Sequence, residues 1–482
     1  MSAQKTGGAP RAKVVLIAVI GLHLVAETAL TPFLPQLFDR LYGIEDPGAT
    51  GLYLWVCRIV GLAALPLWGL AARRWPLHKL VLAGLCGSAV IDVLLGLAPS
   101  YAAYLALSTA VVATNSALLL AYPAFIAEHR DDPDGGEQSR LTGICSIVVV
   151  FHLSVVVSTL VGAGVLALPE PRIGISAFAL LDAGLAVLAY RVLGRGKGPA
   201  ASAGTAGEAD AADTVGTPGT PGTPGTPGMP GAAGPAEPVD SPGTGAAPGA
   251  DGAPAVADPP REAPSGAVDG RAPSRRRWLL LLVQVALIGV AFDFSVNVAR
   301  PFFTEYSESL GSGSVGAAAL FFLPSVAALA VLPAARRCHA MLGDRLLPLA
   351  LLVAAAGLGW QALAGSLPGL VGGRLLFGLG LGLGQVAVEL RMFRVTGTAG
   401  PAFTAVETAR AAGLLAAPLV ATAAVSRDLV LPLAVAAVVQ VLATVLSLRG
   451  TRTERAAPAP VLTPAAVARA VPHRPTPGDT AP

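Results

Sequence analysis

Charged residues are scarce in this chain of 482 residues: aspartate, glutamate, lysine and arginine together make up 13% of it, whereas hydrophobic residues make up 53%. A soluble domain ordinarily carries about a quarter charged residues. The hydrophobic residues also gather in long blocks, and an uncharged block of roughly 18 or more residues is typical of a bilayer-crossing helix. The composition therefore excludes an ordinary soluble globular protein and indicates a membrane protein.

Cysteine is scarce as well, and the four cysteines share no CxxC or cysteine–histidine spacing, so neither a disulfide framework nor a zinc site is indicated. The chain contains no Walker A sequence, which argues against ATP-driven transport. No nucleophile–base pair or metal-ligand set stands out in the sequence. We therefore predict that the protein is not an enzyme, needs no cofactor or metal, and binds no nucleic acid.

Twelve hydrophobic blocks can be counted along the chain. At a rise of about 1.5 Å per residue, each block is about long enough to cross a bilayer. Backbone groups in lipid must be satisfied within their own segment, which favours helices at this length. We therefore predict an all-α membrane protein with 12 transmembrane helices. The predicted spans are residues 14–37, 51–71, 80–98, 101–126, 142–167, 174–193, 278–298, 314–333, 346–364, 368–390, 402–425 and 429–448.

Lysine and arginine are distributed unevenly between the two sides of these spans. With the N-terminus placed in the cytoplasm, 26 of the 33 basic residues fall in cytoplasmic segments and four in outer segments. Three more lie inside spans: Arg58, Arg374 and Arg410. Because cytoplasmic loops carry the excess of basic residues in membrane proteins, we predict a multi-pass protein of the cell (cytoplasmic) membrane with both termini in the cytoplasm.

Spans six and seven are separated by a stretch rich in alanine, glycine and proline that includes "GTPGTPGTPGTPGMPG". Such a stretch cannot bury enough apolar surface to offset the entropy lost on ordering. The predicted domains are an N-terminal six-helix bundle at 1–194, a disordered cytoplasmic linker at 195–274, a C-terminal six-helix bundle at 275–455 and a disordered cytoplasmic tail at 456–482.

The two halves contain similar short segments. Ala-Ala-Arg-Arg occurs after span two in "LWGLAARRW" (67–75) and after span eight in "VLPAARRC" (331–338). The segment "TPFLPQLFDRLYG" (31–43) after span one resembles "RPFFTEYSESLG" (300–311) after span seven. Both offsets are about 265 residues, which predicts two six-helix pseudo-repeats.

With six plus six spans around a long central loop, the sequence resembles the major facilitator superfamily. In "GLAARRWPLHK", between spans two and three, Gly69 and Arg74 match the signature of that family, while Arg73 stands at its aspartate position and Pro76 at its second glycine position. Span ten, "GGRLLFGLGLGLGQ", is similar to the arginine-and-glycine motif of drug/proton antiporters. The resemblance implies alternating access around a cavity at the membrane midplane, with Gly69, Arg73 and Arg74 in a cytoplasmic gating loop.

The glycine run in span ten, residues 378–384, also looks like a dinucleotide-binding loop, but it lies inside a span with no strand before it. Glycines four residues apart let helices approach closely. We therefore predict that this run packs against other helices.

Ionisable residues inside the spans are the candidate functional residues, because an unpaired charge there costs about 2.5–3.5 kcal/mol. Glu27 in span one, Arg58 in span two and Asp92 in span three have similar depths of roughly 18–20 Å above the inner face, which predicts a Glu27–Arg58–Asp92 cluster. His23 lies one turn from Glu27 on the same helix face, and such a pair can pass a proton because imidazole titrates near neutrality. A permanent structural pair of Glu27 and Arg58 is the alternative.

The second half carries a corresponding set. Asp293 and Asn297 lie one turn apart in span seven, and Arg374 in span ten has a similar depth, which predicts an Asp293–Arg374 pair. A structural salt bridge is the alternative for this pair. Glu407 and Arg410, three residues apart in span eleven, are predicted to pair within one helix.

These features predict a secondary active transporter for a small organic solute, with proton-coupled export preferred over uptake. In this hypothesis Glu27 and His23 carry the proton, Arg58 tunes Glu27 or binds an anionic group, and Asp293 with Arg374 forms the facing polar patch. The predicted partners are the solute and the lipid bilayer, for a monomer driven by a proton gradient. Two alternatives remain: a uniporter or sugar-type permease with structural charges, and a non-transporting membrane receptor or assembly partner.

Overall fold

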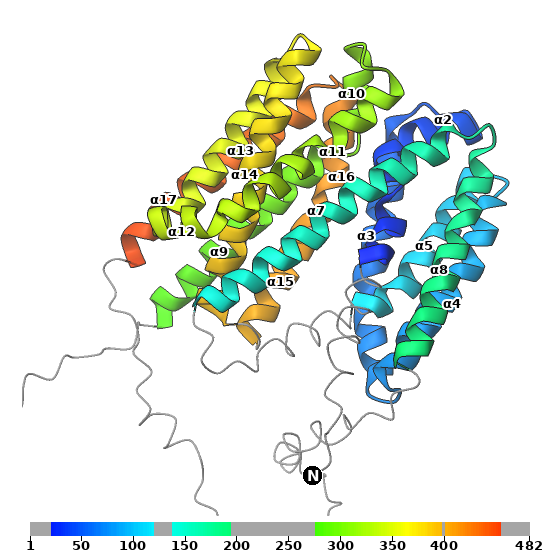
Figure 1. Ribbon diagram of the computed structural model, residues 1–482, viewed down its shortest axis with the longest axis horizontal. Coiled ribbons are helices and arrows are strands. Elements are labelled where there is room, and N and C mark those ends of the chain that lie inside the picture. Colours follow the sequence, from blue (N-terminus) through cyan, green and yellow to red (C-terminus); the bar gives the residue numbers. More distant parts are fainter. Residues whose placement is uncertain (1–20, 120–136, 194–274, 398–400, 455–482) are drawn as a thin grey trace, which may run out of the picture. The chain divides into compact units, whose positions relative to one another are not determined.

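The computed structural model describes residues 21–119, 137–193, 275–397 and 401–454. All regular structure in these ranges is helical, as Figure 1 shows. The long helices are α3 (Pro47–Ala72), α4 (Leu77–Gly96), α5 (Tyr101–Leu119), α7 (Glu137–Ala167), α8 (Pro171–Leu193), α9 (Arg275–Val298), α11 (Gly313–Val331), α13 (Leu346–Leu363), α14 (Leu367–Thr396), α15 (Pro401–Leu414), α16 (Ala416–Val425) and α17 (Leu431–Glu454). The short helical segments are η1 (Thr31–Phe33), α2 (Leu34–Tyr42), α10 (Phe303–Ser309), η2 (Leu332–Ala334), α12 (Ala335–Leu342) and η3 (Gly343–Arg345).

Nine segments of the described chain are long and apolar enough to cross a membrane, and one of them, Gly313–Leu363, includes both α11 and α13. The protein is therefore a multi-pass membrane protein of helical fold. Several helices follow the predicted spans: α4 and α9 differ from the predicted 80–98 and 278–298 by only a few residues at either end, whereas the predicted 402–425 consists of two helices, α15 and α16.

The first predicted span, 14–37, continues past the end of its helix, which stops at Thr28 and is followed by a bend. Pro32 and Pro35 stand in the first turns of η1 and α2. Proline fits a first turn but interrupts a continuing helix, because it has no N–H to donate. The chain therefore starts a new, short helix here, which ends at Gly43 with a φ of 65°, a value that favours glycine.

The segment after α9 repeats this arrangement: a bend, the short helix α10, and Gly311 with a φ of 87°. The two short segments also contact each other. Thr304 Oγ1 donates a hydrogen bond to the Pro32 carbonyl over 2.7 Å, and Gln36 Nε2 donates to Glu308 Oε2 over 3.3 Å. These bonds tie the end of the first span to the end of the seventh.

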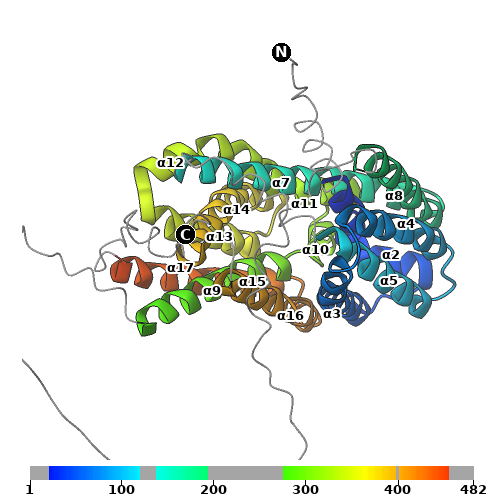
Figure 2. The same ribbon diagram turned by 90° about the horizontal axis from the view of Figure 1, so that it is seen from below.

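The same kinds of helix pair recur in the two halves of the chain. In the first half, α4 packs on α5 and α8, and α3 packs on α5; in the second half, α13 packs on α14 and α17, and α11 packs on α14. Two further pairs join the halves, α7 with α11 and α3 with α16, and both pairs lie side by side in Figures 1 and 2. At the second of these contacts, a Cβ on Gly51 would lie 1.9 Å from Thr422 Oγ1, so only glycine fits.

The glycine run of α14 packs against helices, as the sequence predicts. A Cβ on Gly382 would lie 2.8 Å from the Ala328 Cα of α11, and one on Gly380 would lie 2.3 Å from the Ala354 N of α13. Both values are shorter than Cβ contacts in proteins, so glycine lets α14 approach α11 on one face and α13 on another.

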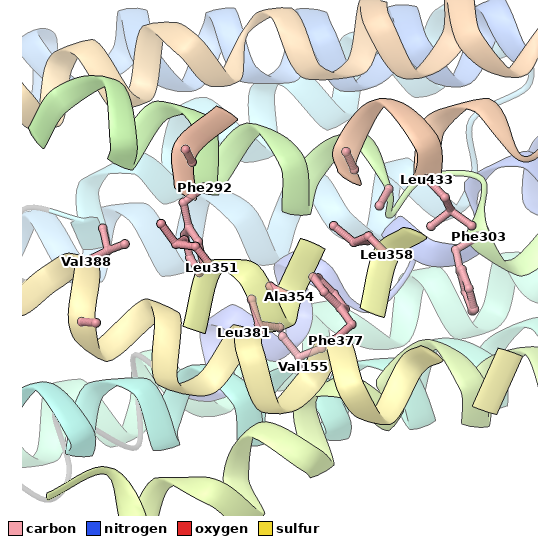
Figure 3. Close-up of a cluster of buried hydrophobic side chains, with 14 of the residues drawn as sticks. Val155, Phe292, Phe303, Leu351, Ala354, Leu358, Phe377, Leu381, Val388 and Leu433 are labelled. Atoms are coloured by element: carbon pink, nitrogen blue, oxygen red, sulfur yellow. The ribbon is translucent and has the colours of Figure 1, made fainter. Parts of the chain in front are cut away.

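A cluster of buried hydrophobic side chains joins the helices of the second half (Figure 3). Leu351 and Leu358 of α13 pack with Phe377 of α14 and Phe292 of α9. Val155 of α7 belongs to the same cluster although it comes from the first half. Helix α7 therefore shares the core of the second half.

The predicted linker at 195–274 and the predicted tail at 456–482 lie outside the described residues. The described residues before and after the linker belong to one compact unit.

Candidate functional site

The predicted His23–Glu27 pair is present at the end of the helix that precedes α2. His23 Nε2 lies 3.8 Å from Glu27 Oε2, and the imidazole is buried while 41% of the Glu27 side chain is exposed. The pair forms because the two residues are four apart in a helix and therefore share a face. It places a buried imidazole behind an accessible carboxylate.

Arg58 of α3 reaches the second half of the chain. Its Nη2 donates to Asn297 Oδ1 of α9 over 2.6 Å, and Asn297 Nδ2 donates to the Asp293 carbonyl over 2.7 Å. The carboxylates whose charges act on Arg58 are Glu27 and Asp293. Asp92, the third member of the predicted Glu27–Arg58–Asp92 cluster, is not among the groups whose charges act on Arg58, and the side chain that binds Arg58 is Asn297.

Asp92 of α4 lies beside Asp182 of α8, because α4 turns this face toward α8. Ser88, one turn before Asp92, donates a hydrogen bond to Asp182 Oδ2. Asp92, Asp182 and Glu27 line one pocket in the first half of the chain.

A second polar network is centred on Arg410 of α15. Its Nε lies 2.7 Å from Asp293 Oδ2, and its Nη1 lies 2.9 Å from Glu389 Oε1 and 2.8 Å from Glu407 Oε1. The predicted Glu407–Arg410 pair is confirmed. The predicted Asp293–Arg374 pair is wrong, because Asp293 points to α15 and not to the position of Arg374 on α14.

Glu389 is not among the site residues predicted from the sequence. It lies one residue before the end of the predicted tenth span, 368–390, where a charge is ordinary. The available signal was its place within the predicted span, together with Arg410 on the next predicted span.

Arg374 of α14 binds backbone instead of a carboxylate. Its Nε donates to the Leu320 carbonyl over 2.8 Å and its Nη2 to the Phe321 carbonyl over 2.6 Å. Pro324 lies inside α11 and has no N–H to offer the Leu320 carbonyl four residues earlier. Arg374 supplies the missing donor, with Gln361 Oε1 as a further partner at 3.4 Å, so it stabilises the interrupted helix α11.

The predicted gating residues lie at the end of α3. Arg73 and Arg74 are exposed, and a Cβ on Gly69 would meet open space. Their role in gating stays a prediction. At the corresponding place in the second half, Arg336 Nη2 donates to Thr142 Oγ1 of α7 over 2.6 Å and so links the halves.

Arg300, between α9 and α10, adds positive charge near Arg58. Its Cζ lies 5.6 Å from the ring centroid of Phe321. Burial and the charge of Arg58 lower the pKa of Arg300 to about 10, which leaves the guanidinium charged at neutral pH. His152 of α7, whose Nδ1 is 3.3 Å from Ser325 Oγ, lies within reach of this charge.

Together these contacts form a line of polar groups through helices of both halves, from His23 and Glu27 to Arg58, then Asn297 and Asp293. Such a line can bind polar solutes and protons within otherwise apolar helices. No protein-family model matches the chain, and no curated protein matches it.

Proposed function

We propose that the protein is a secondary active transporter that moves a small organic solute by alternating access and couples its export to protons. The observation that carries this proposal is the 2.6 Å hydrogen bond from Arg58 to Asn297. It joins the two halves of the chain inside membrane-crossing helices, where the charges of Glu27 and Asp293 act on Arg58. Ionisable groups in such helices are costly and generally serve transport or ligand binding.

The helix contacts support a duplicated fold with 12 transmembrane helices, as in the major facilitator superfamily. Each helix of the first half corresponds to the helix six spans later in the second half. The pairs α4–α8, α4–α5 and α3–α5 then correspond to α13–α17, α13–α14 and α11–α14. All six pairs are in contact. The same shift of six spans exchanges two of the pairs that join the halves, α3–α16 and α11–α7. In this proposal, two six-helix pseudo-repeats in the cell membrane, with both termini cytoplasmic, move about these two contacts.

Glu27 is the proton carrier in this proposal. Its carboxylate is the accessible member of the pair with His23, so it exchanges protons with water, and the imidazole relays them. A charged Glu27 attracts Arg58, whereas a neutral Glu27 leaves Arg58 to Asn297. Protonation therefore changes the strength of a contact between the halves, which couples the proton to the conformational change.

The test uses Glu27→Gln in proteoliposomes. A panel of labelled organic solutes first identifies one that the wild-type chain moves under an imposed pH gradient. We expect Glu27→Gln to abolish the gradient-driven flux while size-exclusion behaviour and helicity stay unchanged. Glu45→Gln removes an exposed carboxylate from the same half and is the matched control.

Wild-type pH dependence in Glu27→Gln contradicts the role of Glu27. Wild-type flux that is insensitive to collapse of the gradient favours a uniporter. A correctly inserted wild-type chain that moves none of the solutes contradicts transport itself.

A further inference from the structure

The first half of the chain contains a polar pocket that lies apart from the contact between Arg58 and Asn297. The pocket has a volume of about 80 Å³, which is room for several water molecules or a small organic group. Its walls come from the helix ending at Thr28 and from α3, α4, α5 and α8. All of these elements precede the predicted linker, so the pocket belongs to one half.

The pocket is acidic. Glu27, Asp92 and Asp182 line it, and among the described residues no lysine or arginine does. The groups that act on Asp182 are Asp92, His23 and the hydroxyl of Ser88. A pocket of this charge in an apolar surrounding excludes anions and attracts cations.

Two buried acceptor atoms in the pocket wall have no hydrogen-bond donor. With Asp92 and Asp182 both ionised, Asp182 Oδ1 and Asn115 Oδ1 have no donor, and their residues are 1% and 6% exposed. A buried acceptor without a donor costs about 1–3 kcal/mol, and more when it is charged. The two atoms come from different helices, α8 and α5, and both residues line the same pocket.

Aromatic side chains form the rest of the wall. Tyr104 is 1% exposed and Phe178 is 9% exposed, and Tyr53 lines the pocket beside them. Aromatic faces attract cations, and they cover apolar groups attached to a cation. Carboxylates and aromatic faces together fit an organic ammonium better than a bare metal ion, which would prefer oxygen ligands all round.

We propose that this pocket binds a small organic cation through its protonated amine, with the ammonium donating to Asp182 Oδ1 and Asn115 Oδ1 and the apolar part against Tyr53, Tyr104 and Phe178. The role of the pocket as a substrate site rests on the proposed transport function. The binding of the cation does not depend on that function. The pocket opens beside Glu27, so a bound cation lies next to the proposed proton carrier.

The test is calorimetric binding of phenethylammonium to the purified full chain in detergent micelles. The neutral isostere 2-phenylethanol, the anion 3-phenylpropionate and sodium chloride are the comparison probes. We expect saturable binding of phenethylammonium alone, with an affinity at least tenfold lower in Asp182→Asn. Glu45→Gln, an exposed carboxylate in the same half, is expected to bind like the wild type.

Asn115→Ala provides a second variant on another helix, in case Asp182→Asn fails to fold. We expect it to weaken phenethylammonium binding severalfold. Absence of binding by the folded wild type overturns the proposal, and so does equal binding of the alcohol. Saturable binding of sodium chloride with no binding of phenethylammonium also overturns it, and so does wild-type affinity for phenethylammonium in both folded variants.

Flux of phenethylammonium into proteoliposomes separates this inference from the proposed function. Binding without flux of any solute leaves the cation pocket standing and removes transport. Flux of another solute without binding of phenethylammonium removes the cation pocket and leaves transport standing.

Discussion

Arg410 shows at the scale of a single residue how a charge is accommodated among apolar helices. Its side chain is 12% exposed, and it contacts the carboxylates of Asp293, Glu389 and Glu407. Each contact is charge-assisted, and the guanidinium fork can serve several acceptors at once. Because the three acids come from α9, α14 and α15, this one side chain holds three helices together.

We predict that Arg410→Ala lowers the free energy of unfolding by about 3–5 kcal/mol, since it leaves three carboxylates without their cation. Arg410→Lys should lose less, because it keeps the charge but not the fork. Denaturant unfolding in micelles measures both. Arg427→Ala, at an exposed arginine in the same half, is the control and should change little. An Arg410→Ala variant as stable as this control would contradict the stabilising role.

Glu305 of α10 gives a prediction about pH. Burial, together with the charge of Glu308, raises the pKa of Glu305 from 4.5 to about 7. The folded state therefore favours the protonated acid, and the resulting stability is present below pH 4.5 and is lost as the pH rises to about 7.

We accordingly predict that the melting temperature of Glu305→Gln, minus that of the wild type at the same pH, is larger at pH 8 than at pH 5. Thermal melts of both proteins at the two pH values measure this difference, and Glu45→Gln is the exposed control. A difference that does not change with pH, or that is larger at pH 5, would contradict the burial of the acid.

Helix α11 shows at the scale of an element how a break is repaired from outside. Pro324 leaves the Leu320 carbonyl without its usual donor, and Arg374 of α14 provides one. The glycines of α14 bring its backbone close enough to α11 for this contact. The interrupted helix and the arginine therefore depend on each other.

A double-mutant cycle tests this dependence. We predict that Arg374→Leu is strongly destabilising in the wild-type background and less so with Pro324→Ala, which restores an N–H to the Leu320 carbonyl. The coupling free energy should be on the order of 0.5–3 kcal/mol. Additive effects of the two substitutions on the free energy of unfolding would contradict the role of Arg374 as the donor that replaces the missing N–H of Pro324.

The helices themselves could be predicted from the sequence because hydrophobic blocks end where charged residues and prolines begin. Pairs within one helix, such as His23 with Glu27, could also be predicted because helical spacing fixes them. The pairs between helices could not. Asp293 binds Arg410 and not Arg374 because the rotation of each helix about its axis decides which way a side chain points, and hydrophobic length carries no information about that rotation.

At the scale of the whole molecule, the two halves are joined at several places along their length. Gln36 and Glu308 meet between the short helices, Arg58 and Asn297 meet within the spans, and Thr142 accepts a hydrogen bond from an arginine of α12. In a transporter that works by alternating access, contacts of this kind have to form and break in turn.

We predict that joining positions 36 and 308 blocks transport. Gln36→Cys with Glu308→Cys, in a background without the four native cysteines, is treated with a short bis-methanethiosulfonate cross-linker. Solute flux should fall to the background level and recover after reduction. Each single-cysteine variant with the same reagent is the control. Full flux through the quantitatively cross-linked protein would show that positions 36 and 308 do not separate during transport.

The acceptor for Arg58 is an amide, and this has a consequence for the proposed transport cycle. Separating an arginine from a carboxylate in a low-dielectric surrounding leaves two opposite charges without compensation, whereas leaving Asn297 exposes only a neutral dipole. A charged group bound to a neutral acceptor contributes only about 1.5–3 kcal/mol. In the proposed transport cycle, this one contact between the halves is therefore easier to break than an ion pair at the same place.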